Sequence, residues 1–130
     1  MPRLFTLDEA NALLPQLQSI LEEMQEKKPA LDALREELST LKQAASGNGH
    51  LLAARAQSKQ REAKALADRL NALLGELNDI GCELKGLEEG LIDFPAERDG
   101  RTVYLCWKLG EREISHWHDL ETGFAGRQPL

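Results

Sequence analysis

The stretch TLDEANALLPQLQSILEEMQEKKPALDALREELSTL, residues 6–41, carries the pattern from which the architecture of the chain can be predicted. Apolar residues recur in it at alternating spacings of three and four, which is typical of a helix that packs along another helix. Thr6 and Glu9 form a capping box before it, in which each side chain accepts the backbone N–H of the other. One long helix is therefore predicted over residues 6–44. Its apolar face carries Ala10, Leu13, Leu17, Ile20, Met24, Lys27, Leu31, Leu34, Leu38 and Leu41, of which only Lys27 is polar.

The same pattern predicts a second helix over residues 50–81. Gly81 stands where a left-handed cap residue is expected, and residues 45–50 have the composition of a turn. Two long helices joined by a short turn form an antiparallel hairpin that resembles a coiled coil. The apolar face of the second helix carries Leu52, Ala56, Lys59, Ala63, Leu66, Leu70, Leu73, Leu77 and Ile80.

Four further leucines widen the apolar faces beyond these stripes, namely Leu14, Leu21, Leu51 and Leu74. A helix with so wide an apolar face needs a second surface to cover it. Either a second copy of the chain or the chain's own carboxy-terminal sheet can supply that surface. We favour the second copy, and therefore expect a homodimer.

Residues 82–118 have the composition of a small antiparallel sheet. Strands are expected at 82–85, 91–94, 103–109 and 113–118, separated by glycines, Pro95 and the Asp99-Gly100 pair. The tail, residues 119–130, is expected to be irregular. The fold class is thus α+β, mostly helical, within a single domain.

Composition restricts the function classes. The net charge is −6 and no Lys/Arg cluster is present, which argues against nucleic-acid binding. No apolar run approaches the ~20 residues of a membrane span, and the amino terminus lacks the apolar core of a secretory signal. Cys82 and Cys106 are too few for a disulfide framework. A cytoplasmic protein is expected.

The pairing of the last two predicted strands determines which side chains share a face, because a slip of one residue reverses the faces. A two- or four-residue loop puts Ile114 and both histidines on the Leu/Trp face, with Cys106 on the other. A three-residue loop, 110–112, instead sets Cys106 across from His116 and Tyr104 across from His118. The first grouping makes the better apolar face, and we favour it.

His116 and His118 are candidate metal ligands, because residues two apart project from the same face of a strand. A divalent transition metal such as zinc takes four N, O or S ligands, or three and a water. There is no CxxC or HExxH pattern to support the site. In the alternative interpretation, Trp107 and Trp117 build core while the histidines hydrogen-bond at the sheet rim. Completing ligands would come from Glu111, Asp93, Asp119 or Glu121.

Five motifs span almost the whole chain: FTLDEANALLP at 5–15, GLIDFP at 90–95, LCWKLGE at 105–111, ISHWH at 114–118 and GFAGR at 123–127. They resemble a bacterial family known only as domain of unknown function 2203. The family is uncharacterised, so the resemblance implies no activity. It does imply which positions to examine, and His116 stands where the family often has an aromatic residue. The matching positions are Asp93, Trp107, Glu111, Trp117, His118, Gly123, Phe124 and Arg127.

Arg127, with Trp107 and Trp117, suggests a site for a small anionic ligand, since a guanidinium binds carboxylates and phosphates by its planar fork. In the alternative interpretation, Arg127 pins the tail through a salt bridge to Glu111 or Asp119. Cys106 lies between apolar residues and is interpreted as buried and unreactive.

Three functions follow from these patterns. The favoured one is a non-enzymatic interaction or scaffold protein, which forms a homodimer or grips a protein partner through its helical arms. The second is a metal-binding protein, with a hydrolase as one form of it, centred on His118, Glu111 and Asp93. The third is a binder of small anionic ligands.

Overall fold

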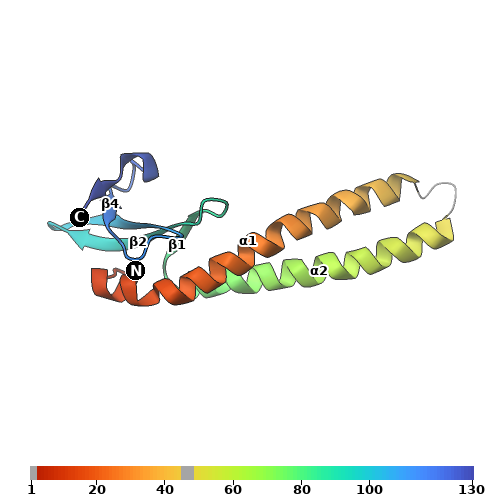
Figure 1. Cartoon of the computed structure of the whole chain (residues 1–130), viewed down its shortest axis with the longest axis horizontal. Helices are drawn as coiled ribbons and strands as arrows, with labels where there is room; N and C mark the ends of the chain where they lie inside the picture. The colour runs from red at the N-terminus through yellow and green to blue at the C-terminus, as the bar shows by residue number, and fades with distance from the viewer. Residues whose placement is uncertain (1–2, 45–48) are drawn as a thin grey trace. The chain divides into compact units, whose positions relative to one another are not determined.

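The computed structural model describes residues 3–44 and 49–130 (Figure 1). Two long helices precede a five-stranded antiparallel sheet in which sequential strands are neighbours, in the order β1-β2-β3-β4-β5. The predicted α+β fold class is confirmed. The elements are α1 (Leu7–Ala44), α2 (Gly49–Ile80), β1 (Glu83–Gly86), β2 (Leu91–Arg98), β3 (Arg101–Lys108), β4 (His116–His118), the 3-10 helix η1 (Phe124–Gly126) and β5 (Gln128–Pro129).

The predicted turn at 45–50 lies mostly outside the described residues, and residues 49–50 already belong to α2. The chain forms two compact units. One comprises the residues up to Glu22 together with Gly75–Leu130, and the other comprises Glu23–Leu74.

The capping box at the start of α1 is present. The Glu9 N–H donates to Thr6 Oγ1 at 3.1 Å, and the Thr6 N–H donates to Glu9 Oε1 at 3.0 Å. Hydrogen bonds from Thr6 hold the pKa of Glu9 below its ordinary value. The two bonds satisfy donors that the first turn of a helix cannot satisfy itself, and so they define where α1 begins.

In the unit Glu23–Leu74 the two helices run antiparallel and share a core. Leu31 and Leu38 of α1 pack with Ala63 of α2. Two ion pairs join the helices beside this core, Glu23 with Arg69 and Glu37 with Lys59. All the positions predicted for the two apolar faces are buried or half-buried, so the periodicity identified the contact surface correctly.

The four additional leucines have different environments. Leu14 and Leu21 are buried, whereas Leu51 is 80 % exposed and Leu74 is 40 % exposed. Leu14 and Leu21 belong to the unit that contains the sheet, and the other two belong to the helical unit. Only Leu51 and Leu74 therefore remain candidates for covering by another chain.

The sheet presents one apolar face and one mixed face. Phe5 packs edge-on against Phe94 with ring centroids 5.2 Å apart, and its N–H donates to the Pro95 carbonyl at 2.7 Å. These contacts dock the start of α1 on the apolar face, whose buried members are Ile92, Phe94, Ala96, Val103, Leu105, Trp107 and Trp117.

The hairpin between β2 and β3 turns at Asp99-Gly100, as the sequence predicted. Both residues have positive φ, 52° and 80°, as a two-residue turn between right-twisted strands requires. Pro95, by contrast, does not interrupt the chain but lies inside β2 opposite Tyr104. Its missing N–H is tolerated there, and β2 extends to Arg98.

The favoured register for the last strands is wrong. Cys106 pairs with His116, and Tyr104 pairs with His118. The other register was favoured because it put Ile114 on the apolar face of the sheet. Ile114 is indeed buried, but it lies in the loop before β4 and not in a strand. Its N–H donates to Asn11 Oδ1 at 2.8 Å. The tail is also more regular than predicted, because β5 pairs with β4.

Candidate metal centre

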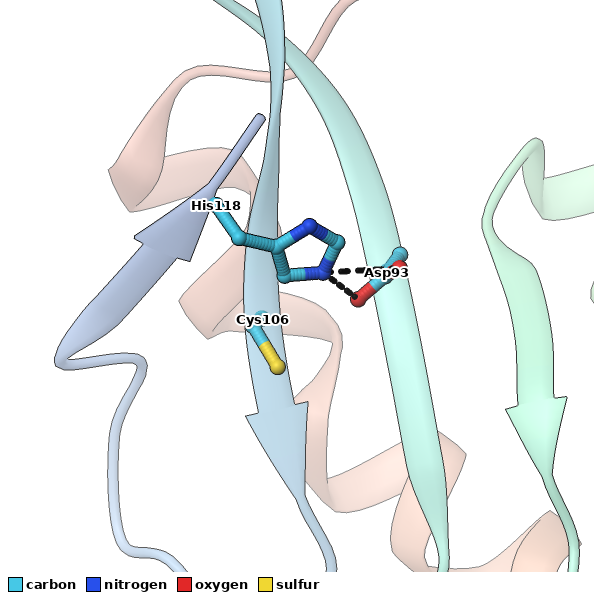
Figure 2. Close-up of side chains that lie close together, drawn as sticks. All are labelled: Asp93, Cys106 and His118. Carbon is cyan, nitrogen blue, oxygen red and sulfur yellow. Dashed lines mark hydrogen bonds and ion pairs between the residues drawn. The ribbon is translucent and has the colours of Figure 1, made fainter. Parts of the chain in front are cut away.

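Three side chains from three adjacent strands meet on the mixed face of the sheet (Figure 2). Asp93 of β2 lies directly opposite Cys106 of β3. His118 of β4 pairs with Tyr104, two residues before Cys106, so its side chain reaches the other two diagonally. Asp93 and Cys106 are 13 positions apart in the sequence, and Cys106 and His118 are 12 positions apart. The register of the strands brings them together.

The three potential ligand atoms are close together and buried. The Cys106 sulfur, a carboxylate oxygen of Asp93 and a ring nitrogen of His118 all lie within 4.8 Å of one another. The exposed fractions of Asp93, Cys106 and His118 are 3 %, 1 % and 2 %. Charged residues are seldom buried to this degree without a partner, so the cluster needs a physical explanation.

Both ring nitrogens of His118 have defined partners. Nε2 lies 3.0 Å from each carboxylate oxygen of Asp93. Nδ1 lies 2.8 Å from the backbone oxygen of Asp119, which can only accept, so Nδ1 carries a proton. This contact fixes the ring orientation and directs Nε2 towards Asp93 and Cys106.

Burial dominates the electrostatics of the two acidic groups. It raises the pKa of Asp93 above its ordinary value, against the opposing influence of His118 and Lys85. It also raises the pKa of the Cys106 thiol to about 11, and the neighbouring Asp93 carboxylate adds to this effect. Arg127 opposes the shift at the thiol without reversing it. The centre thus lacks enough positive charge to ionise both groups easily.

The geometry does not fit a cysteine nucleophile. An activated thiol needs a base that accepts its proton, and this is usually an imidazole nitrogen in hydrogen-bond contact. The two nitrogens of His118 engage Asp93 and the Asp119 carbonyl instead. The raised thiol pKa agrees with this conclusion, since a reactive cysteine has a lowered one.

A small cavity adjoins the three groups, with a volume of about 110 Å³. The tail closes one side of it, and β1 and β3 contribute the rest of the wall. The lining residues other than the three potential ligands are Lys85, Leu91, Tyr104, Leu120, Gly123 and Phe124.

The structure separates the predicted metal ligands into two groups. His118 and Asp93 belong to the cluster, whereas His116 and Glu111 do not. His116 Nδ1 is 2.9 Å from Ser115 Oγ. Glu111 accepts the Lys108 N–H at 2.8 Å and forms an ion pair with Arg127 at 3.2 Å, so its carboxylate organises the loop before β4.

The predicted ligand-binding residues do not line the cavity. Arg127 pins the tail through Glu111, as the alternative interpretation expected, and its guanidinium also stacks on Phe124. Trp107 and Trp117 lie buried on the opposite, apolar face of the sheet. Trp107 Nε1–H donates to the Glu111 carbonyl at 2.9 Å, so this indole has a structural partner.

Cys106 is the member of the cluster that sequence reasoning set aside. Its apolar neighbours predicted burial correctly, but burial was taken to mean that it has no role. The three-residue-loop register did set Cys106 opposite His116 and beside His118. The sequence was therefore compatible with Cys106 lying beside His118. The wrong assignment of Ile114 to a strand led to the other register.

Within the described residues, no helix combines the length and the apolar character that crossing a membrane requires. The chain belongs to the family of uncharacterised conserved proteins called domain of unknown function 2203, whose family model matches residues 3–130. The resemblance seen in the sequence motifs is thereby confirmed. Comparisons with the curated proteins and with the solved structures each found no match.

Proposed function

We propose that the protein binds one divalent transition-metal ion, such as zinc, through Asp93, Cys106 and His118. The observation that carries the proposal is the convergence of a carboxylate, a thiol and an imidazole from three strands at one buried point. These are the three side-chain types that zinc prefers. Their strands are paired, so the ligands are supported by the sheet and not by a loose loop.

The distances suit a metal after a small adjustment. Zinc bonds of about 2.0–2.3 Å put neighbouring ligands of a tetrahedral site roughly 3.3–3.6 Å apart. Asp93 and His118 are 3.0 Å apart, slightly closer than this, and the cluster as a whole spans no more than 4.8 Å. Side-chain shifts of about 1 Å would complete the site.

The hydrogen bond from His118 Nδ1 to the Asp119 carbonyl supports the same function. A histidine that binds a metal through one nitrogen usually donates from the other to a carbonyl or carboxylate. The bond at 2.8 Å leaves Nε2 as the nitrogen directed at the centre. It holds the tautomer that a metal bound at Nε2 requires.

Charge balance also favours a dication. A thiolate, a carboxylate and a neutral imidazole carry two negative charges, which a divalent ion neutralises. Without such an ion, burial raises the pKa of both acidic groups. A metal therefore offsets the cost of ionising Asp93 and Cys106 in this environment.

The fourth coordination position would face the cavity. Structural zinc sites use four protein ligands, whereas sites with three keep a position for water or substrate. The cluster supplies three ligands, and its cavity adjoins all of them. These contacts support metal binding. A hydrolase activity would in addition require a substrate that reaches the metal.

Metal content tests the proposal. Protein purified without an affinity tag is incubated with zinc, dialysed and analysed by mass spectrometry. We expect about one zinc per chain, lost in His118→Ala and in Cys106→Ser. His116→Ala and Cys82→Ser are the matched controls and should keep the metal, because His116 lies two residues away and Cys82 is a second buried thiol. Equal metal content in all four variants would refute the site.

Self-association along the helical unit is a second candidate role. The observation that favours it is the exposure of Leu51 and Leu74, at 80 % and 40 %. The two leucines are 23 positions apart on α2 (74 − 51), about 35 Å along its axis, so a second copy would have to lie along the length of the helix to remove both from water. The scaffold function that the sequence suggested depends on such an assembly, and the mass of the protein in solution tests it.

A further inference from the structure

We infer that the fourth coordination position takes a small carboxylate or a carbonate-sized anion, bound to the metal and to Lys85. This inference rests on the proposed metal site. It adds the chemical class of the ligand and a residue that selects it. The size of the cavity, the character of its wall and the charge of the centre all favour such a ligand.

The cavity has room for only a small group beside the metal. Pockets for drug-sized molecules have volumes of about 300–1,000 Å³, and a cavity of about 150 Å³ holds one benzene molecule. The cavity here has a volume of about 110 Å³. Because the cavity is partly open to solvent, this volume limits the part of a ligand that enters it, and that part is smaller than benzene. Acetate, bicarbonate and a few water molecules all fit.

The wall selects an anion with a small apolar part. Leu91, Leu120 and Phe124 supply apolar surface. Lys85 and Tyr104 supply the polar groups beyond the three metal ligands, and of these two Lys85 carries a positive charge. The Lys85 ammonium lies 4.7 Å from the centroid of the Tyr104 ring, and that ring lies 5.5 Å from the ring of His118. Lys85 and His118 thus both approach the Tyr104 ring, and all three side chains line the same cavity.

Charge gives Lys85 its role. The metal with a thiolate, a carboxylate and a neutral imidazole has no net charge, so a bound anion leaves one negative charge in a buried place. Lys85 is close enough to stabilise negative charge on Asp93. It is 3.1 Å from Glu83, but an ammonium has three donors and can serve Glu83 and an anion together.

The experiment uses the whole chain loaded with cobalt, whose visible absorption depends on its ligands. Acetate is titrated at ionic strength held constant with perchlorate. Acetamide has the shape of acetate without its charge, and benzoate has its charge with a larger body. We expect a saturable spectral change with acetate, a weaker one with benzoate and none with acetamide. Lys85→Met should weaken acetate binding by about tenfold, because it removes a charge-assisted hydrogen bond.

Lys108→Met is the matched control. Lys108 is a nearby lysine on β3 that approaches Phe124 but does not line the cavity, so its removal should leave acetate binding unchanged. A cobalt spectrum that does not respond to acetate would overturn the anion inference and leave the metal site intact. An equal response to acetamide, or undiminished acetate binding in Lys85→Met, would overturn it as well. Failure to bind cobalt at all would instead refute the proposed function.

Discussion

His118 Nε2 lies 3.0 Å from both carboxylate oxygens of Asp93, although the strands that carry these two residues are not neighbours in the sheet. β3 runs between them and contributes Cys106 to the same point. The contact therefore ties β4 to β2 across an intervening strand. It gives the sheet a connection that backbone pairing cannot supply, and it assembles the candidate centre.

Removal of the imidazole should destabilise the metal-free fold. His118→Ala leaves the Asp93 carboxylate buried without its principal partner, and breaking a buried pair in this way costs about 3 kcal/mol or more. Urea unfolding followed by circular dichroism in the presence of a chelator measures the free energy of unfolding. His116→Ala, at the half-buried neighbouring histidine, should cost less than about 1 kcal/mol. Equal losses in the two variants would mean that the Asp93–His118 contact does not stabilise the sheet.

Metal affinity should rise with pH. The pKa of Cys106 is raised to about 11 and the pKa of Asp93 is raised by burial, so in the metal-free protein the thiol is protonated near neutrality. A metal must displace that proton, and binding therefore strengthens as proton concentration falls. Chelator-competition titrations between about pH 6 and pH 9 should give a slope of about one decade in affinity per pH unit.

The Cys106→Ser variant provides the comparison for that slope. This variant should bind the metal more weakly, and its affinity should lose the part of the pH dependence that comes from the thiol. A wild-type affinity that stays constant over this pH range would show that Cys106 does not ionise on binding, and would remove it from the ligand set.

The helix boundary at Thr6 should contribute measurably to stability. Thr6→Ala removes the acceptor of the Glu9 N–H, and loss of such a cap costs about 1 kcal/mol. Thr40→Ala, within α1, is the control, because its hydroxyl donates to the Glu36 carbonyl of the same helix. Chemical denaturation of both variants should show a larger loss for Thr6→Ala. The reverse order would contradict the assigned role of the capping box.

The exposed leucines predict an assembly that depends on them. If copies associate along the helical unit, the double variant Leu51→Gln, Leu74→Gln should shift the protein towards the monomer mass in light scattering coupled to size exclusion. Leu120→Gln is a control, since Leu120 is 52 % exposed but lies in the tail. A wild-type protein that is monomeric at high concentration would exclude this assembly.

The sequence determined the helices better than the centre, and the reason is the range of the interactions involved. Spacing within α1 and α2 is a local property, so Leu31 and Leu38 could be assigned to the core directly. The position of Ile114 is not local. Its N–H binds Asn11, more than a hundred residues earlier, and this contact takes Ile114 out of the strand. No spacing rule within residues 103–118 contains that information.

The two missed features of the sheet have the same origin. β5 has only two residues, one of them a proline, and it is held by pairing with β4 and by the Leu130 N–H that donates to the Ser115 carbonyl. Cys106 lies beside His118 because of the register between β3 and β4. The pairing of β5 with β4 helps to hold that register. Asp93 and His118 could be identified as candidate ligands from their residue types. Cys106 could be identified as the third ligand only from the pairing of the strands.

Absorption by the cobalt-substituted protein shows whether Cys106 binds the metal together with Asp93 and His118. A cysteine thiolate bound to cobalt gives a sulfur-to-metal charge-transfer band, which no carboxylate or imidazole can produce. The wild-type protein and Cys82→Ser should both show this band, and Cys106→Ser should lack it while remaining folded. A band that persists in Cys106→Ser, or a wild-type protein with no band at saturating cobalt, would contradict a metal centre formed by Asp93, Cys106 and His118.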